Sequence, residues 1–520
     1  MTTMWRVLAL ACAIAVFPPL AAAQVATVAE GALSGMQERD VSVFYGVPFA
    51  APPVGALRWA APQPAVAWQG PRAANRLPAS CPQVLMPDGF MMYTREYLTP
   101  APPGVSEDCL FANIWTPQLP GSTQARAALP VLVFIHGGGY TSGSGTVPIY
   151  NGANLARKEL VVVTINYRLS ALGFLAHPEL TAEQGGASGN YAIQDQIQAL
   201  RWIQRNIAAF GGDPSKVTIA GQSAGAGSVL ALLVSPQAKG LFRNALVQSA
   251  PGMGDYPLLT QAEQRGAALL RSWGVDSIAA ARALPAEKLA VPAGPAGGGS
   301  MIADGKVIPR VPSPPLMASD VPVMVGYTFN DLFAVTRKLT AAQWQVEARQ
   351  RYGGRAAEFL RYYPGGTDAE ASRSATRESV DRSQMAPILQ WMATRGANSP
   401  VYAYLFSHVE PGPKSAEYGA FHSSDLPYMF DTLSMSPERN FTEVDRRVVE
   451  QFGGAVVNFV KTGKPEGGSV PAWPALTQQG KAVMEFGDEA RLVRVYPAGA
   501  DAVMAAGRAP QGPPAGAHAE

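Results

Sequence analysis

Two continuous apolar runs constrain the fold of this chain more than any other feature. VLVFI at 131–135 and LVVVTINY at 160–167 are rich in β-branched residues and contain no charged residue. Runs of this kind are typical of strands that are buried on both faces of a sheet, so both sides of the sheet need a cover. The sequence therefore favours a parallel sheet with helices on both faces.

The segments that follow alternate between helical and strand patterns. Apolar residues recur at helical spacing through 190–214, where the pattern stops at Gly211-Gly212. A short β-branched run at 217–220 comes next, and then a segment rich in small residues and leucine. Three more predicted strands follow, at 242–250, 321–327 and 401–409. This order of strand, helix and strand predicts an α/β protein with a mostly parallel sheet.

A single serine lies where the strand 217–220 becomes a helix. Gly221-Gln222-Ser223-Ala224-Gly225 fits G-x-S-x-G, in which a sharp strand-to-helix turn projects the serine hydroxyl outward and needs flanking glycines without a Cβ. An ordinary Gly/Ser loop is the alternative, because the bare pattern also arises by chance. The strand-turn-helix setting favours Ser223 as a nucleophile.

A nucleophilic serine needs donors for the oxyanion that its attack creates. HGGG at 136–139 follows the strand 131–135 directly, and its glycines allow backbone N–H groups to approach a substrate oxygen. Gly138, Gly139 and Ala224 are the predicted donors. A glycine loop after a strand is usually only a turn, but its combination with the serine turn supports the hypothesis that Ser223 is catalytic.

The serine also needs a base, and the chain offers five histidines. His518 lies near the C-terminus and His136 belongs to the glycine element. His177 and His408 suit structural roles, one before a proline and one at a strand end. His422 lies on a polar loop after the strand 401–409 and satisfies the chain order serine, acid, histidine. We expect His422 to be the base.

The acid that orients the base should lie between Ser223 and His422 in the sequence. Asp331 follows the strand 321–327 in the turn GYTFNDLF, where a carboxylate can orient an imidazole. Asp304 and Asp381 remain weaker alternatives.

The chain has 520 residues, of which 47% are hydrophobic and 15% are charged, so it can bury a large core. Lys and Arg number 41 against 39 Asp and Glu, which leaves a formal net charge of +2. This balance gives no electrostatic reason to expect nucleic acid or an anionic membrane surface as a partner.

The N-terminus has the pattern of a secretory signal. Arg6 precedes the apolar run 7–17, and Ala21-Ala22-Ala23 offers a small-residue cleavage site, which predicts a signal peptide over 1–23. The run is too short to span a bilayer, so we expect no stable membrane anchor. The prediction is an exported protein, either periplasmic or secreted. The Ala/Gly/Pro-rich segment 498–520 is expected to be a disordered tail.

Three cysteines are present, and Cys12 would leave with the signal peptide. Cys81 and Cys109 would remain in an oxidising compartment, where two thiols most simply form one disulfide. No histidine lies near them, so we predict no metal site.

Several blocks, in order along the chain, resemble the type-B carboxylesterase and cholinesterase family. They are FYGVPFAAPPVGALRW, SEDCLFANIWTP, HGGGYTSGSG, NYRLSALGFL, GQSAGAGS, GAFHSSDLPYMF and NFVKTGKP. The resemblance implies a single domain over 24–497 with the α/β-hydrolase fold, in which helical insertions lie over the active site. It also implies ester hydrolysis on a small-molecule ester substrate without a cofactor, and it leaves the oligomeric state open.

The resemblance assigns roles to individual residues. It makes Ser223 the nucleophile, His422 the general base, and Asp331 the acid where the family usually has glutamate. Gly138, Gly139 and Ala224 would form the oxyanion hole, and Cys81 with Cys109 would close the family's first disulfide loop. Two structural ion pairs are implied as well, Arg58 with Glu107 and Arg168 with Asp195.

Two departures from the family narrow the range of expected substrates. Gln222 stands before the serine where many members have glutamate, which makes it a candidate for the substrate pocket. Residues 82–108 contain no tryptophan, on which cholinesterases hold a quaternary ammonium by cation-π attraction. An uncharged or aromatic ester is therefore favoured over a choline ester. The same loop offers an apolar set that either lines the pocket or only packs the loop, namely Met86, Met91, Met92, Tyr93 and Tyr97.

The alternatives are a specialised esterase for a bulky natural ester, of the feruloyl or mycotoxin type, or a lipase. A non-catalytic binding module of the same fold is a further alternative, but such a module has no need to retain Ser223 and His422.

Overall fold

The computed structural model describes residues 24–121, 128–250, 256–290, 300–309, 318–331, 338–388, 395, 399–477 and 482–494. The predicted signal peptide 1–23, the predicted tail 498–520 and His518 lie outside the described residues.

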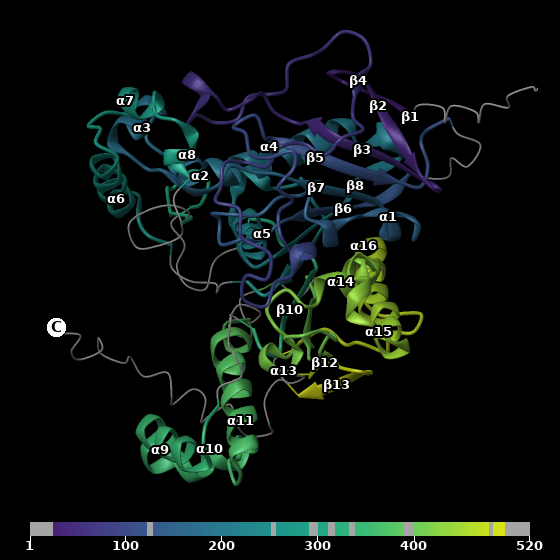
Figure 1. The fold of residues 1–520 in the computed structure, drawn as a ribbon, viewed down its shortest axis with the longest axis vertical. Coiled ribbons are helices and arrows are strands. Elements are labelled where there is room, and N and C mark those ends of the chain that lie inside the picture. Colours follow the sequence, from purple (N-terminus) through teal and green to yellow (C-terminus); the bar gives the residue numbers. More distant parts are fainter. Residues whose placement is uncertain are drawn as a thin grey trace, which may run out of the picture.

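The described strands join into one sheet, which Figure 1 shows crossing the molecule with helices packed around it. Its order is β1-β2-β3-β5-β7-β6-β8-β9-β10-β11-β12-β13, with β4 beside β2. The strands are β1 Gln24–Val28, β2 Gly31–Glu38, β3 Val41–Pro48, β4 Arg72–Ala73, β5 Phe111–Thr116, β6 Leu129–Ile135, β7 Val161–Ile165, β8 Gly212–Gln222, β9 Asn244–Gln248, β10 Val323–Thr328, β11 Val401–Phe406, β12 Ala482–Phe486 and β13 Ala490–Arg494. All neighbours from β7 through β12 in this order are parallel, which confirms the predicted α/β architecture.

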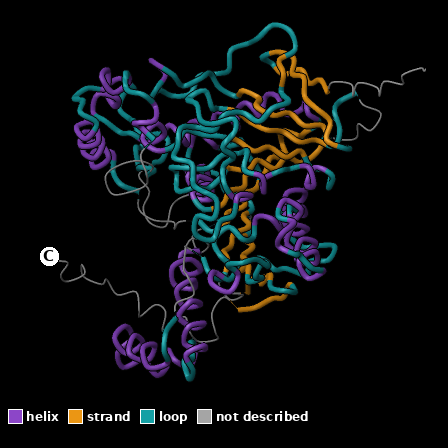
Figure 2. The backbone as a smooth tube through the Cα atoms, in the orientation of Figure 1, coloured by secondary structure: helices purple, strands orange, loops and turns teal. Residues whose placement is uncertain are grey.

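Helices cover both faces of this sheet, as the purple segments on either side of the orange strands show in Figure 2. They are α1 Ala153–Ala156, α2 Ser170–Phe174, α3 Pro178–Glu183, α4 Tyr191–Asn206, α5 Ala224–Val234, α6 Leu259–Ser272, α7 Ile278–Arg282, α8 Ala286–Leu289, α9 Ala341–Tyr352, α10 Ala356–Tyr362, α11 Asp368–Val380, α13 Ser415–Tyr418, α14 Leu426–Phe430, α15 Glu443–Val448 and α16 Gly454–Thr462. Apolar residues of α4 and α5 belong to one buried cluster, and those of α14 and α16 belong to another.

Strand β6 shows why its sequence is apolar throughout. Side chains of a strand alternate between the two faces of a sheet. Val131 and Ile135 of β6 belong to the cluster that contains α4 and α5, whereas Leu132 and Phe134 belong to the opposite cluster. Both faces of β6 are therefore buried, as its continuous β-branched run predicts.

The helical pattern within 190–214 ends at Gly211, as predicted, but the start of the next strand differs. Helix α4 runs to Asn206, and a 3-10 turn continues through Ile207–Phe210. Gly211 then adopts φ 79°, a left-handed conformation that suits glycine and ends the turn. Strand β8 begins at the next residue, well before the predicted start at 217.

Two helical groups leave the sheet between strands that are neighbours in it. Helices α6, α7 and α8 lie between β9 and β10 in the chain, and α9, α10 and α11 lie between β10 and β11. In Figure 1 the second group extends away from the body of the molecule.

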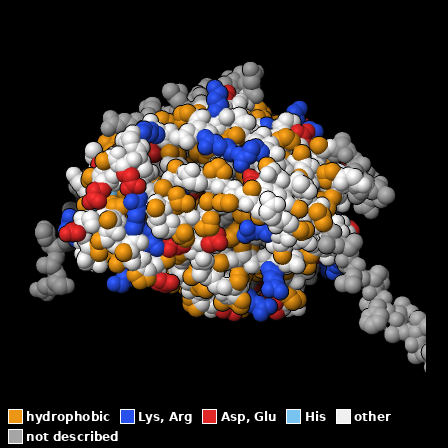
Figure 3. Space-filling view, turned by 90° about the horizontal axis from the view of Figure 1, so that it is seen from above, with side chains coloured by type: hydrophobic (Ala, Val, Ile, Leu, Met, Phe, Trp, Pro, Cys, Tyr) orange, Lys and Arg blue, Asp and Glu red, His pale blue; other side chains and the backbone are white. Residues whose placement is uncertain are grey.

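Charged side chains of both signs occur on the face drawn in Figure 3. Figure 3 shows acidic and basic side chains scattered among apolar ones over the face seen from above. Within the described residues, no helix combines the length and the apolar character needed to cross a membrane.

Candidate active site

Ser223 lies at the turn between β8 and α5, as the sequence predicts. Its backbone has φ 57° and ψ −124°, a region that a residue with a Cβ rarely adopts. The Ser223 N–H donates to the carbonyl oxygen of Gln248 on the neighbouring strand β9, at 2.9 Å. A strained residue held in this way is typical of a functional site.

The glycines around Ser223 are required by close backbone contacts. A Cβ on Gly225 would lie 2.0 Å from the carbonyl oxygen of Ile135, at the end of β6. A Cβ on Gly221 would lie 2.4 Å from Gly225. The glycine element also packs here, because a Cβ on Gly137 would lie 3.0 Å from the Ser223 Cβ. The structure thus brings the segment 136–139 against the serine.

His422 and Asp331 come together through two neighbouring strands. β10 and β11 are parallel, and the segments after them form a further bridge between Asn330 and Phe421. The Asn330 N–H donates to the carbonyl oxygen of Ala420 at 2.9 Å. This pairing places the Asp331 Oδ1 in hydrogen-bond contact with the His422 Nδ1, and both side chains are buried.

The other imidazole nitrogen meets the serine turn. Gln222 is buried, and its Nε2 lies 3.1 Å from the Nε2 of His422. Because the His422 Nδ1–H faces a carboxylate, its Nε2 is the nitrogen that can accept a hydrogen bond, and the Gln222 amide N–H is a matching donor. Gln222 thus contacts the imidazole directly. The sequence indicated only that Gln222 is a candidate for the substrate pocket.

Two of the predicted oxyanion donors lie where the backbone has a positive φ, which favours glycine. Gly138 and Gly139 adopt φ 107° and φ 61°, and the Gly138 carbonyl oxygen accepts hydrogen bonds from the backbone N–H groups of Thr141 and Ser142 at 3.1 and 3.0 Å. Within the described chain, the N–H groups of Gly138, Gly139 and Ala224 form no hydrogen bond. These donors are therefore available to a ligand at Ser223.

The remaining histidines in the described residues have structural surroundings. His136 is buried and stacks on Tyr167, and burial lowers its pKa to about 4. His177 caps α3 by accepting from the Glu179 N–H. His408 lies between Asp445 and Asp488, at 3.0 and 2.9 Å.

The two alternative acids lie elsewhere. The Asp304 Oδ1 accepts three backbone N–H groups, from residues 306–308. Asp381 pairs with Arg377 at 2.9 Å and accepts from the Tyr363 hydroxyl. Asp331 is the candidate that contacts His422.

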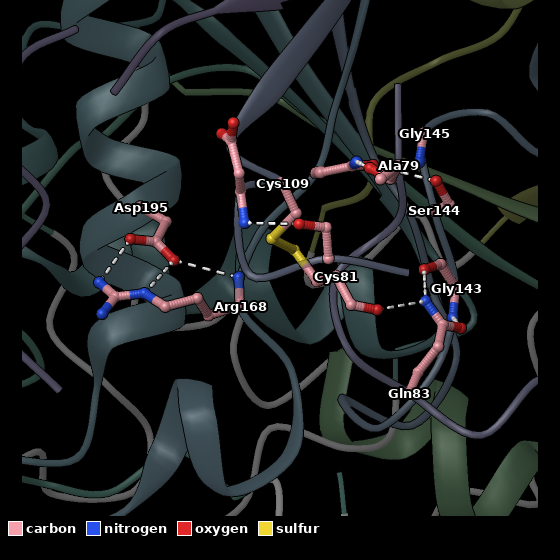
Figure 4. The surroundings of a disulfide bond; sticks show 12 residues. Ala79, Cys81, Gln83, Cys109, Gly143, Ser144, Gly145, Arg168 and Asp195 are labelled. Atoms are coloured by element: carbon pink, nitrogen blue, oxygen red, sulfur yellow. Dashed lines mark hydrogen bonds and ion pairs between the residues drawn. A yellow bond between two sulfur atoms is a disulfide. The ribbon is translucent and has the colours of Figure 1, made fainter. Parts of the chain in front are cut away.

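Cys81 and Cys109 form the predicted disulfide. Figure 4 shows Gln83, in the loop that they close, hydrogen-bonded to Gly143. The Gln83 side chain donates to the Gly143 carbonyl oxygen and accepts from the Gly143 N–H, both at 2.8 Å, and Gly143 follows the glycine element. Both implied ion pairs are present: Arg58 with Glu107 at 2.8 Å, and Arg168 with Asp195 at 2.7 Å.

The apolar set of the disulfide loop divides between packing and the site. Met92 and Tyr97 are buried in a core cluster, and Met86 is exposed. Tyr93 instead reaches the catalytic candidates, because its hydroxyl donates to the His422 carbonyl oxygen at 3.3 Å. Neither of the two predicted roles describes the whole loop.

A buried charged cluster, which the sequence does not indicate, lies beside this loop. Arg439 contacts the carboxylates of Glu96 and Glu410 at 3.0 and 2.7 Å, and the Tyr97 hydroxyl donates to Glu410 at 2.8 Å. Burial raises the pKa of Glu410 to about 7, even though Arg439 favours its charged form. These residues are 343 positions apart at the extremes, so no local pattern indicates their contact.

A second missed carboxylate lies three residues after His422. Asp425 is buried and accepts hydrogen bonds from Gln248 and Tyr404, at 3.0 and 2.9 Å. Burial raises its pKa to about 6. Its position on a turn after a buried strand, within the block GAFHSSDLPYMF, was the available indication. No group of three or more metal-binding side chains occurs in the described parts of the chain.

Known proteins match this chain over most of its length. The model of the carboxylesterase family matches residues 22–502. Phenmedipham hydrolase of Pseudarthrobacter oxydans is 37% identical over 487 residues, covering 88% of this chain and 94% of the relative. Fumonisin B1 esterase of Sphingopyxis macrogoltabida is 34% identical over 488 residues, covering 88% of this chain and 85% of the relative. The solved structure of the carboxylesterase EST55 of Geobacillus stearothermophilus superimposes with a TM-score of 0.75 at 32% identity, covering 93% of this chain and 99% of that one.

Proposed function

The chain belongs to the carboxylesterase family and is an ester hydrolase, and from that premise we propose that Ser223, His422 and Asp331 carry out the hydrolysis. The observation that supports this proposal most is the contact of one imidazole with both the acid and the serine turn. Its two nitrogens face Asp331 and Gln222, and Gln222 is the residue before the serine.

The reaction proceeds in two acyl-transfer steps. The Ser223 oxygen attacks the ester carbonyl carbon while the His422 Nε2 takes the hydroxyl proton, and the C–O bond to the alcohol breaks as His422 returns that proton to the alcohol oxygen. Water then attacks the acyl-enzyme in the same manner, releasing the acid and restoring Ser223. Asp331 keeps the proton of the neutral imidazole on Nδ1, so that Nε2 can act as the base.

Three backbone N–H groups stabilise the oxyanion in both steps. Gly138 and Gly139 supply two of them and Ala224, the first residue of α5, supplies the third. The N-terminus of α5 adds a favourable dipole at the same place.

The substrate class follows from the residues around the serine. Gln222 is neutral, and the disulfide loop presents tyrosine and methionine in place of a tryptophan, so a cationic choline group finds little to hold it. An uncharged or aromatic ester fits these surroundings. A bulky natural ester remains the principal alternative, and the relative named fumonisin B1 esterase favours it over a lipase.

The chain is proposed to act outside the cytoplasm as a single catalytic domain, 24–497. The signal pattern at 1–23 supports this location, and so does the disulfide between Cys81 and Cys109, because disulfides persist in oxidising compartments.

Replacing the nucleophile tests the proposal. Ser223→Ala should lower kcat on short p-nitrophenyl esters by about 10⁶-fold if the triad acts as a unit. The unaltered enzyme should release a burst of p-nitrophenol equal to the enzyme concentration, and an organophosphate should abolish the burst. A loss below tenfold in Ser223→Ala would show that another residue is the nucleophile. A panel of esters varied in acyl length and alcohol would then define the substrate.

A further inference from the structure

A pocket apart from the proposed active site lies where α11 faces the last strand of the sheet. It has a volume of about 420 Å³, which is within the size range of sites for small molecules. Arg373 and Arg377 of α11 line it, together with Arg491 and Arg494 of β13. Figure 1 shows α11 as a long helix that approaches the sheet near β12 and β13.

The charges in this pocket do not balance. Arg377 pairs with Asp381, and Arg491 pairs with Glu485, at 2.9 Å in each case. Arg373 and Arg494 form no ion pair with a described residue, and Glu485 is the only acidic residue among those that line the pocket. Two guanidinium groups, one from α11 and one from β13, are thus available to an anion. Guanidinium groups bind carboxylates in a planar, bidentate manner.

The rest of the wall is aromatic. Phe329, Tyr362 and Tyr363 line the same pocket, and Val493 adds a further apolar side chain. Tyr363 is buried, and its hydroxyl donates to Asp381, so its ring is fixed in place. A wall of this kind favours a ligand with an apolar body in addition to its charge.

From these features we propose that the pocket binds an organic monocarboxylate with an aromatic or aliphatic body, its carboxylate between Arg373 and Arg494. Organic acids of this kind are the acid products of ester hydrolysis, so the identification of the ligand as product rests on the proposed function. The binding itself rests only on the pocket.

The position of the pocket gives such binding a route to the active site. Phe329 lines the pocket and lies two residues before Asp331, and its N–H donates to the Phe406 carbonyl oxygen at 2.8 Å. A ligand packed on Phe329 thus contacts the segment that presents the acid to His422. An acid bound there would affect turnover without competing for the serine.

Binding of benzoate to the Ser223→Ala enzyme, followed by calorimetry, tests the proposal without any turnover. We expect saturable binding with a Kd on the order of 1 mM, weakened when the salt concentration is raised, because the guanidinium groups are exposed. Arg373→Gln with Arg494→Gln should raise the Kd at least tenfold. The matched control, Arg271→Gln with Arg349→Gln, removes two exposed arginines outside the pocket and should leave the Kd unchanged.

Two further probes separate the parts of the proposal. Benzamide has the same ring without the charge and should not bind, whereas sulfate has charge without an apolar body and should bind more weakly than benzoate. An equal Kd for benzoate in the pocket variant and the control variant would overturn the proposal.

The source of the ligand needs a separate comparison, between acids whose esters the enzyme hydrolyses and acids whose esters it leaves intact. Selective binding of the first group identifies the product as the ligand, and equal binding of both groups identifies organic acids from the surroundings. Full activity of Ser223→Ala on esters would refute the proposed function and leave the binding result standing.

Discussion

The two halves of the proposed active site are held by different kinds of contact. On the nucleophile side, backbone fixes Ser223: glycines without Cβ atoms let β6, β8 and α5 approach closely, and the Ser223 N–H bonds to the adjacent strand. On the base side, side chains from distant segments hold the loop of His422, including Tyr93 and the charged cluster of Glu96, Arg439 and Glu410. The first half should therefore respond to added volume, and the second to changes in charge and pH.

The largest effect is expected from Gly225→Ala. The new Cβ would lie 2.0 Å from the carbonyl oxygen of Ile135, and backbone cannot move aside as a flexible side chain can. We expect a loss of about 3 kcal/mol in the free energy of unfolding, together with a collapse of kcat, because α5 must shift at Ser223. Urea denaturation and steady-state kinetics measure both.

Gly354→Ala is the matched control for this substitution. Gly354 is exposed and no atom lies within 4 Å of the position of its Cβ. Its effect on unfolding should stay within about 0.5 kcal/mol. Equal effects of the two substitutions would show that close packing does not define the nucleophile side.

The nucleophile side is also the half that the sequence predicts best. Its strand, turn and helix occupy consecutive positions, so hydrophobic pattern and glycine placement predict their order and the position of the turn. The HGGG element was predictable for the same reason, since it follows directly on the buried strand β6. The start of β8 at Gly212 was not predictable. It depends on Gly211 adopting the left-handed conformation, and the sequence does not show which of the two adjacent glycines does so.

On the base side, Glu410 should make stability depend on pH. Burial raises its pKa from the ordinary 4.5 to about 7. Between these values the native chain keeps a proton that the unfolded chain has lost, so stability falls as the pH rises, by up to about 1.4 kcal/mol per pH unit. Glu410→Gln removes the carboxyl group that binds this proton. The free energy of unfolding of the variant should therefore decline less steeply between about pH 5 and pH 7.

Unfolding free energies at several pH values measure that slope. Asp425 and Asp381, whose pKa values burial raises to about 6, contribute a decline of the same sign below pH 6, so the comparison must be between native and variant curves. Glu443→Gln removes an exposed carboxylate and should leave the slope unchanged. Identical curves for native protein and Glu410→Gln would contradict the prediction.

Gln222→Glu tests the contact that joins the two halves. A carboxylate 3.1 Å from the His422 Nε2 would favour the protonated imidazole, which cannot accept the serine proton. The acid limb of the profile of kcat/KM against pH should therefore move to higher pH by about one unit, which is about a tenfold loss of rate on that limb. Gln350→Glu adds the same charge on an exposed face of α9 and should leave the profile in place. An unmoved profile in Gln222→Glu would mean that the amide does not contact the imidazole in solution.

The base side was predictable only in part. His422 and Asp331 could be inferred from chain order and strand ends, because parallel neighbours bring their carboxyl ends together. Gln222 could be identified as unusual but not as a partner of the imidazole. The contacts of Tyr93, Glu96 and Arg439 join segments more than 300 residues apart, and neither periodicity nor spacing reports such pairs.

The smallest effect is expected from Tyr93→Phe, which removes one hydroxyl from the base side and leaves the packing intact. The ring of Tyr93 lies 5.8 Å from that of Tyr97 and 6.1 Å from that of Phe421, contacts that phenylalanine retains. The hydrogen bond to the His422 carbonyl oxygen is lost, and a bond of this kind contributes about 0.5–1.5 kcal/mol. If that energy holds the imidazole in place, kcat should fall by about 3- to 10-fold with little change in Tm. Tyr45→Phe is the matched control. It removes a hydroxyl that donates a hydrogen bond to Glu38, on strands far from β10 and β11 in the sheet, and should leave kcat unchanged. A fall in Tm without a fall in kcat would show that Tyr93 holds the disulfide loop but not the base, and the base side would then depend on its charges alone.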